Sequence, residues 1–399
     1  MQPIADSSPR TAPGPRAGRG RWIWRLSGVV TIALIAAVVG FTTLRTASRP
    51  VRVALMAMPA RSFTVTSPVT ALNVQSYGAP IKVTAVPGAP VRVTEQVVYG
   101  SNLSGPPGVT GSDAHGLLTL AAAECANANC SVAFTVTVPT GVTVTAAADG
   151  GQVTLTGTGA ANIDSGGGPV YASQVSGPLT VTAGGGEVNV DNLTGSAVLD
   201  SGGGPVNATD VSGKLKVDAD GGEISVSGAP TASLDSGGGP VNATGIGGPL
   251  TVSTEGGGVT VSTAGATSVD SGGGPVTATT IRGPLTVTAE GGGIQADDVT
   301  GAFSADTGGG PLSAAGLRSP TATVGTEGGN ASVEFTSAPA AVRVQTGGGG
   351  ATLSVPGGPY AVTADSGGAT DSVAVATSPG AASTISVTTD GGDLQIGPA

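Results

Sequence analysis

The sequence predicts an all-β fold, a Gly-rich β-solenoid, and three observations carry this prediction. Gly contributes 69 and Pro 28 of the 399 residues, while aromatic residues make up only 3%, so little in the chain could fill a thick core. Val, Thr and Ile alternate with polar residues through the second half, which is typical of strands with one buried face and not of disordered chains. Gly-rich strings also recur at a fixed spacing, the signature of a repeat architecture.

The repeat is read most directly from one hexapeptide. Asp-Ser-Gly-Gly-Gly-Pro begins at Asp164, Asp200, Asp235 and Asp270, and a Thr variant of it begins at Asp306. Successive copies lie 36, 35, 35 and 36 residues apart. A second kind of Gly run lies between the copies, so the unit is about 18 residues long and alternates between two forms.

Each unit predicts two short strands joined by two turns. In one unit Leu250 and Val252 alternate with polar residues before a Gly run, and Val259 and Val261 do so after it. Such a unit cannot bury its own apolar face, and stacking the units does so. We therefore expect a solenoid over residues 146–399 of about 14 coils and about 65 Å, at about 4.8 Å per coil, wound right-handed.

Residues 46–145 differ from the repeat and predict a linker with a β-rich cap. They hold Pro-rich edges, strand-like runs and the only His of the chain, His115. A cap would cover the open edge of the first coil, as solenoids require at their ends. Cys125 and Cys130 lie in this range, and for an exported chain we expect a small disulfide between them. Free thiols and a metal site are the alternatives, and a zinc site would need further ligands.

The N-terminal region predicts a cytoplasmic tail and a membrane anchor. Residues 1–21 are rich in Arg, Pro, Ser and Gly and are expected to be a disordered tail. Residues 22–45 are expected to form one transmembrane helix, since Leu26–Leu44 is 19 residues long without a charge, and Trp22 and Trp24 precede it. The expected topology places the N-terminus in the cytoplasm and the C-terminal domain outside the cell membrane. A cleaved signal peptide is the alternative.

The charge of the remaining chain restricts its partners. From Ser62 onward there are seven Lys or Arg and 25 Asp or Glu, a balance of −18. Such a surface repels the phosphates of nucleic acids. It favours cations, basic polymers or basic proteins.

One set of acids suggests a cation site. In a solenoid, residues at equivalent positions stack, so acids that precede the Gly turns are expected to form one stripe about 5 Å apart. Calcium bound between the coils would offset their repulsion; the alternative is that Asp suits turns and keeps the edge soluble. The set consists of Asp200, Asp220, Asp235, Glu255, Asp270, Glu290, Asp306 and Glu327.

No enzyme site is expected, and no cofactor other than that calcium. A Ser nucleophile needs a base beside it, and His115 stands alone in a Gly/Ser/Asp-rich stretch. A carbohydrate-active β-helix needs clustered acids and aromatic platforms, yet the coils hold only Tyr171, Phe303, Phe335 and Tyr360, widely spaced.

The segment from Phe134 through Val-Pro-Thr-Gly-Val to the first Gly-rich coils resembles a bacterial family. This is the β-strand-repeat domain of unknown function labelled putative adhesin, often found behind one membrane helix. The resemblance covers about residues 60–399 and implies a β-repeat fold and an envelope-associated role. It implies no catalytic residues, and the regular Asp-Ser-Gly-Gly-Gly-Pro strings depart from the family pattern.

Three functions from different classes follow. The first is a non-enzymatic, membrane-anchored adhesin or cell-envelope interaction module that binds a cell-wall polymer, a glycan or a surface protein. The second is an envelope-stress sensor whose Arg-rich tail reports inward. The third, a carbohydrate-active enzyme, would need a groove with converging acids and aromatics.

Overall fold

The computed structural model describes residues 55–101, 103, 105–123 and 130–399 of the chain. The predicted tail at 1–21, the predicted transmembrane segment at 22–45 and Cys125 lie outside the described residues. Within these ranges there is no helix with the length and apolarity needed to cross a membrane.

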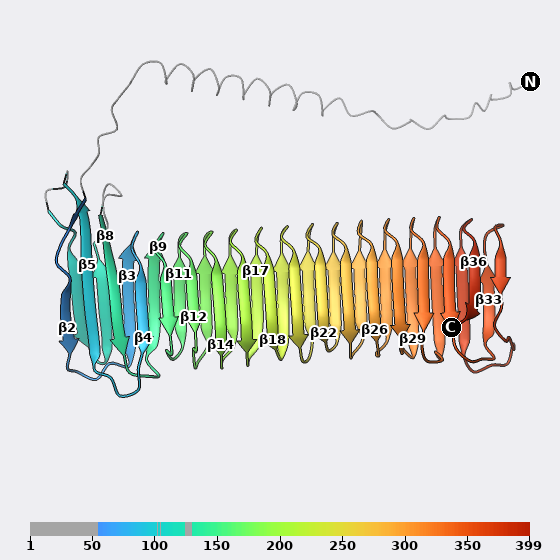
Figure 1. Cartoon of the computed structure of the whole chain (residues 1–399), viewed down its shortest axis with the longest axis horizontal. Coiled ribbons are helices and arrows are strands. Elements are labelled where there is room, and N and C mark those ends of the chain that lie inside the picture. Colours follow the sequence, from blue (N-terminus) through green and yellow to red (C-terminus); the bar gives the residue numbers. More distant parts are fainter. Residues whose placement is uncertain (1–54, 102, 104, 124–129) are drawn as a thin grey trace, which may run out of the picture. The chain divides into compact units, whose positions relative to one another are not determined.

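The described residues confirm the all-β solenoid, because strands alternate between two sheets along the chain (Figure 1). Sheet A contains β1 (Leu55–Ala57), β2 (Arg61–Val65), β4 (Ile81–Ala85), β5 (Val91–Gly100), β8 (Cys130–Val138), β10 (Val153–Thr156), β12 (Val170–Ser173), β14 (Val188–Leu193), β16 (Val206–Val211), β18 (Ile224–Ala229), β20 (Val241–Ile246), β22 (Val259–Ala264), β24 (Val276–Ile281), β26 (Ile294–Val299), β28 (Leu312–Leu317), β30 (Ala331–Phe335), β32 (Ala351–Val355), β34 (Asp371–Val373) and β36 (Leu394–Pro398).

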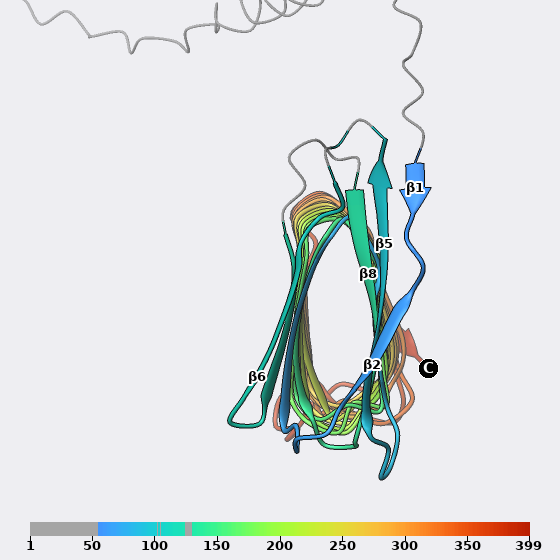
Figure 2. The same ribbon diagram turned by 90° about the vertical axis from the view of Figure 1, so that its left-hand side faces the viewer.

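Sheet B faces sheet A across the core (Figure 2). It contains β3 (Ala71–Tyr77), β6 (Val109–Ala114), β7 (Leu117–Ala122), β9 (Thr143–Asp149), β11 (Ala161–Ser165), β13 (Leu179–Ala183), β15 (Ala197–Ser201), β17 (Lys214–Ala219), β19 (Thr231–Ser236), β21 (Leu250–Thr254), β23 (Thr267–Ser271), β25 (Leu285–Ala289), β27 (Phe303–Thr307), β29 (Thr321–Thr326), β31 (Ala341–Thr346), β33 (Ala361–Asp365) and β35 (Thr384–Thr389). One sheet B strand and the sheet A strand that follows it make one coil.

Equivalent residues of successive coils stack in register. Val252 on β21 pairs with Leu234 of the coil before and with Val269 of the coil after, all in parallel strands. Inward side chains such as Val252 are about 1% exposed, while Thr251 and Ser253 on the same strand face solvent. The period of two therefore produces one continuous apolar column between the sheets, as the sequence predicts.

The solenoid has about 12 turns, not the 14 expected from the Gly runs. The regular stack extends through sheet A from β10 to β32. The later Gly runs at Gly367 and Gly391 belong to the end coils, which do not follow the order of the sequence. Counting each Gly run as one more rung therefore overestimates the regular stack.

At the N-terminal end the first coil is inserted between two later ones. Strand β3 pairs with β9 on one side and with β7 on the other, and β4 pairs in the same way with β10 and β8. Antiparallel strands close this end: β5 against β8, β1 and β2 against β5, and β6 against β7 (Figure 2). The parallel ladders thus begin at Ala71, inside the range that the sequence assigns to the cap.

The C-terminal end mirrors this arrangement. The last strands of the chain, β35 and β36, lie between β31 and β33 and between β32 and β34 respectively. Strands β33 and β34 therefore form the outermost coil at this end, although they precede β35 in the sequence. The first and the last regular coils of the chain are both held between two neighbours.

Candidate functional site

The eight predicted acids lie in two columns, not in one stripe. Asp235 and Asp270 lie within sheet B strands, on the outward face, and each precedes a buried Ser. Glu255 and Glu290 lie two positions further along the coil, just past the end of the strand. The strand column contains Asp200, Asp235, Asp270 and Asp306, and the turn column contains Asp220, Glu255, Glu290 and Glu327. The single-stripe expectation is therefore wrong.

Successive members of each column are two coils apart. Ser253 on β21 separates Asp235 from Asp270, so their backbones are about 9–10 Å apart at about 4.8 Å per strand. Asp218, which is not one of the eight, lies between Asp200 and Asp235, so three neighbouring strands carry an Asp there. All eight predicted acids are exposed, so water and salt screen their repulsion.

The staggering has a steric cause. A Cβ on Gly237 would lie 2.3 Å from the backbone oxygen of Asp220 in the preceding coil, and one on Gly272 would lie 2.5 Å from that of Glu255. The coil after each acid of the turn column therefore requires Gly at the stacked position. Two successive coils therefore cannot both carry an acid at this position, which agrees with the two alternating forms of the 18-residue unit.

The described residues contain no group of three or more His, Cys, Asp or Glu that could hold a metal ion. Calcium takes six to eight oxygen ligands, whereas each coil from β15 to β29 offers one of these eight carboxylates. Calcium binding by the acids remains a hypothesis.

The Ser of Asp-Ser-Gly-Gly-Gly-Pro closes the turn. The buried Ser201 Oγ donates to the carbonyl oxygen of Gly204 at 2.9 Å, and the same bond recurs at 2.7–2.9 Å in the copies at Ser165, Ser236 and Ser271. The third Gly permits close stacking, since a Cβ on Gly239 would lie 2.0 Å from the backbone oxygen of Gly222. The hexapeptide thus has a structural explanation.

The sequence reasoning missed a column of left-handed residues. One residue near the end of successive sheet A strands has φ between 53° and 72°, and the strand register skips it. Asn, Asp and Gly tolerate this conformation, and they fill most of the column. The signal was present as a recurrence six residues after the Gly of each run that stacks closely on the preceding coil, for example Gly257 before Thr263. The column consists of Gln174, Asn192, Asp210, Gly228, Gly245, Thr263, Thr280, Asp298 and Gly316.

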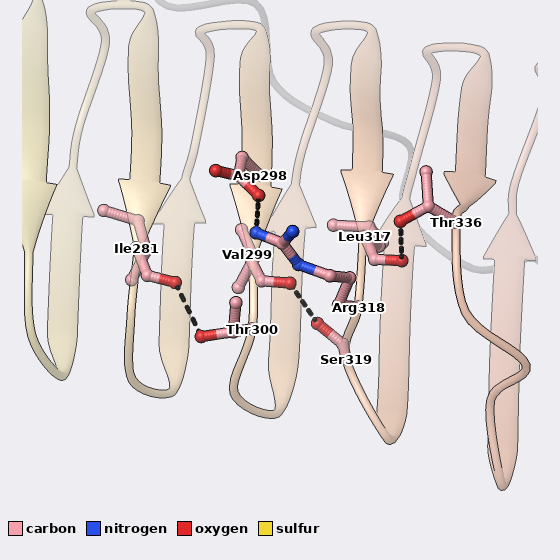
Figure 3. A network of polar contacts seen from close by, with 8 residues as sticks. All are labelled: Ile281, Asp298, Val299, Thr300, Leu317, Arg318, Ser319 and Thr336. Carbon is pink, nitrogen blue, oxygen red and sulfur yellow. Dashed lines mark hydrogen bonds and ion pairs between the residues drawn. The ribbon is translucent and has the colours of Figure 1, made fainter.

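One member of this column, Asp298, forms an ion pair near the ends of the sheet A strands (Figure 3). The Arg318 guanidinium contacts the Asp298 carboxylate, and both side chains are about half exposed. Beside it, Thr300 and Ser319 each donate a hydroxyl to a carbonyl of the preceding coil at 3.3 Å. A surface ion pair of this kind contributes about 0–1 kcal/mol to the free energy of unfolding. Together these contacts join successive coils where the sheet A strands end.

His115, Tyr171 and Cys130 lie outside the acidic columns. His115 is exposed in the turn between β6 and β7, as expected for a loop histidine. Tyr171 donates to Glu187 Oε2 at 3.3 Å, and the charge of that carboxylate raises the pKa of Tyr171 above its ordinary value. Cys130 is disulfide-bonded, and its predicted pairing with Cys125 stays a prediction because Cys125 lies outside the described residues.

No protein-family model and no curated protein matches the chain. Solved structures that align with it include the following three. A putative adhesin from Parabacteroides distasonis is 15% identical, with a TM-score of 0.31, over 71% of this chain and 98% of that one. A putative adhesin from Bacteroides fragilis is 12% identical, with a TM-score of 0.23, over 86% and 97%. A putative cell adhesion protein from Clostridium sporogenes is 8% identical, with a TM-score of 0.18, over 86% and 99%.

These descriptions agree with the label of the family that the sequence resembles. At such identities and TM-scores the likeness says nothing about a ligand or an activity.

Proposed function

We propose that the chain is a non-enzymatic, membrane-anchored surface protein that acts in adhesion or cell-envelope interaction. The observation that carries the proposal is the uniform stack from β10 to β32, in which each coil repeats the same register and the same polar outer faces. A stack of this kind holds its two ends apart. It serves as a spacer more naturally than as a container for a reaction.

The sequence before the rod supports a tether at its N-terminal end. Ten residues separate Leu44, the end of the charge-free segment, from Leu55, where β1 begins. Even fully extended they reach about 35 Å. A helix over residues 22–45 would therefore keep the start of the rod close to the membrane surface, with the C-terminal domain outside the cell.

The outer surface narrows the class of partner. An excess of acids over bases along the rod disfavours nucleic acid and favours basic groups on a cell-wall polymer, an aminated glycan or a surface protein. Calcium bridging between these carboxylates and an acidic partner is the further possibility that the experiment includes.

The test uses the full chain incorporated into lipid vesicles. Binding of these vesicles to immobilised wall polymers, glycans and matrix proteins is measured with calcium and with a chelator, and vesicles without protein are the control. Saturable binding to one class is the expected result. Vesicles that fail to incorporate the chain contradict the anchor, and incorporated chain that binds no surface contradicts adhesion. Release of sugar from the glycans would contradict the non-enzymatic assignment.

A sensing role is the second candidate, because the first 25 residues hold five Arg and a single acid. Here the rod would respond to the envelope and the tail would contact an acidic partner in the cytoplasm. Deleting residues 1–21 should then abolish an envelope-stress response while leaving surface binding unchanged. An unchanged response would remove this candidate.

A further inference from the structure

The C-terminal end of the solenoid leaves its last core layer open. In the regular coils, inward valines such as Val252 and Val269 are 1–2% exposed. In the outermost coil, Val373 on β34 pairs with the buried Ile396 and so faces inward, yet it is 40% exposed. Val362 on the facing β33 is only partly buried. No further coil covers these side chains within the described residues.

A hollow of about 580 Å³ lies at this open layer. Val362 and Ala364 line it from sheet B, Val373 lines it from sheet A, and Ile385 of the next coil contributes as well. Ser378 and Pro379, from the loop that leads into β35, line it further. The volume falls in the range of about 300–1,000 Å³ that is typical of ligand sites, and the lining combines Ala, Val, Ile and Pro with Thr and Ser.

The strands that border the hollow also have free edges. Among the described residues the strand β33 pairs only with β35, and β34 pairs only with β36. Tyr360, directly before β33, forms one parallel bridge with Thr377 of the loop before β35, so the edge is open along Ala361–Asp365. Figure 1 shows β33 at the extreme end of the stack. An edge strand presents unpaired backbone N–H and C=O groups to any extended chain that approaches it.

The N-terminal end has edge strands of a different kind. There β1 and β2 run antiparallel along β5 and β6 runs antiparallel along β7, and among the described residues none of the three pairs with another strand. Apolar side chains are exposed at this end too, with Leu55 65% and Phe63 39% exposed. The C-terminal end differs because its outermost strands continue the parallel coil and border the hollow between the two sheets.

Charge defines what the open end accepts. After Arg343 every charged residue is acidic, namely Asp365, Asp371, Asp390 and Asp393. Asp365 ends β33 and Asp371 begins β34, so a carboxylate lies on each of the two edge strands. An occupant with basic side chains would complement them.

We propose that the C-terminal end binds an extended, basic polypeptide segment of a partner protein by strand addition to β33. Alternate apolar side chains of the segment enter the hollow between β33 and β34. Its Lys or Arg side chains lie on the outer face of sheet B, where they meet Asp365, and its backbone continues the ladder of that sheet. This rests on the proposed adhesive function and names the partner class of that function.

The probe is a fluorescent peptide of sequence Lys-Val-Thr-Val-Lys-Val-Thr, titrated by anisotropy against the full chain in mild detergent. Val373→Asp places a charge in the hollow and should weaken binding at least about tenfold, a change of about 1.4 kcal/mol. The matched control is Val198→Asp, because Val198 is 45% exposed on the outer face of β15 in the regular stack. It should leave peptide affinity unchanged.

Two altered peptides separate the parts of the proposal. Replacing the central Val by Pro removes a backbone donor and should abolish binding, and replacing Lys by Glu should weaken it. Equal affinity for the Val373→Asp and Val198→Asp variants would overturn the proposal, as would the absence of saturable binding by the unaltered chain. Self-association that Val373→Asp abolishes, without peptide binding, would assign the end to a second copy instead. Surface binding by vesicles that persists in the Val373→Asp variant would refute this inference and leave the adhesive function standing.

Discussion

In the coils from β10 to β32 every inward side chain has a coil on both sides, whereas the outermost coil at each end has one side without such a neighbour. In these regular coils Gly is required at each position where the backbone of the preceding coil lies too close for a Cβ atom. The N-terminal end closes with antiparallel strands, whereas the C-terminal end stops at the parallel coil of β33 and β34, and apolar side chains are partly exposed at both ends. Repetition thus makes the middle uniform, and features that could recognise a partner arise where the repetition stops.

The largest expected effect comes from two adjacent glycines of one turn. Gly239→Ala should destabilise the rod by about 3 kcal/mol, because its Cβ would lie 2.0 Å from the Gly222 oxygen. Gly238→Ala should change stability by less than about 0.5 kcal/mol, because no atom lies within 4 Å of its Cβ. Denaturant midpoints of the two variants check this. Equal midpoints would contradict close stacking at the third Gly.

A second prediction compares an inward valine of the middle with one of the end. Val252→Ala should cost about 2 kcal/mol, because it opens a cavity between two coils. Val373→Ala should cost less than about 0.5 kcal/mol, since its side chain is 40% exposed. The same unfolding measurement applies. A cost at Val373 as large as that at Val252 would show that the end is covered in solution.

A smaller effect, in the opposite direction, is expected at the left-handed column. Thr263 is β-branched and has φ of 55°, a conformation that costs about 1–2 kcal/mol for such residues. Thr263→Asn should raise the unfolding free energy by about 0.5–1 kcal/mol, because Asn tolerates this conformation. Thr260→Asn, on the same strand, serves as the control and should not stabilise. A lower unfolding free energy in the Thr263→Asn variant would show that the backbone at Thr263 is not strained.

The smallest expected effect concerns the acidic columns. Asp218 lies between Asp200 and Asp235 on neighbouring strands, so Asp218→Asn should raise the melting temperature at low salt by relieving about 0.2–1 kcal/mol of repulsion. The gain should vanish at high salt. Asp270→Asn, flanked by Ser253 and Thr288, should give less. A salt-independent gain at Asp218 would point to a cause other than charge.

The sequence predicts the repetitive part of this fold because its constraints are local. Leu250, Val252, Val259 and Val261 define two strands and a buried face by spacing alone, and the Gly runs mark the turns. The two acidic columns were missed because Asp235 and Glu255 both stand shortly before a Gly run, and the strand register is needed to show that Glu255 lies two positions further along its coil. The order of β33 to β36 depends on pairing across the end of the stack, for which no local pattern exists. The sequence reasoning contained no indication of the open layer at Val373.

The central claim is that the middle of the rod is a spacer and its C-terminal end carries recognition. Deleting residues 236–270 removes one repeat and joins Asp235 to Ser271, which restores Asp-Ser-Gly-Gly-Gly-Pro at the junction. Binding of vesicles that carry this shortened chain to the surface that the full chain recognises tests the claim most directly. The account predicts unchanged affinity for the shortened chain and loss of affinity for Val373→Asp. Loss of binding in the shortened chain, with Val373→Asp unaffected, would contradict it.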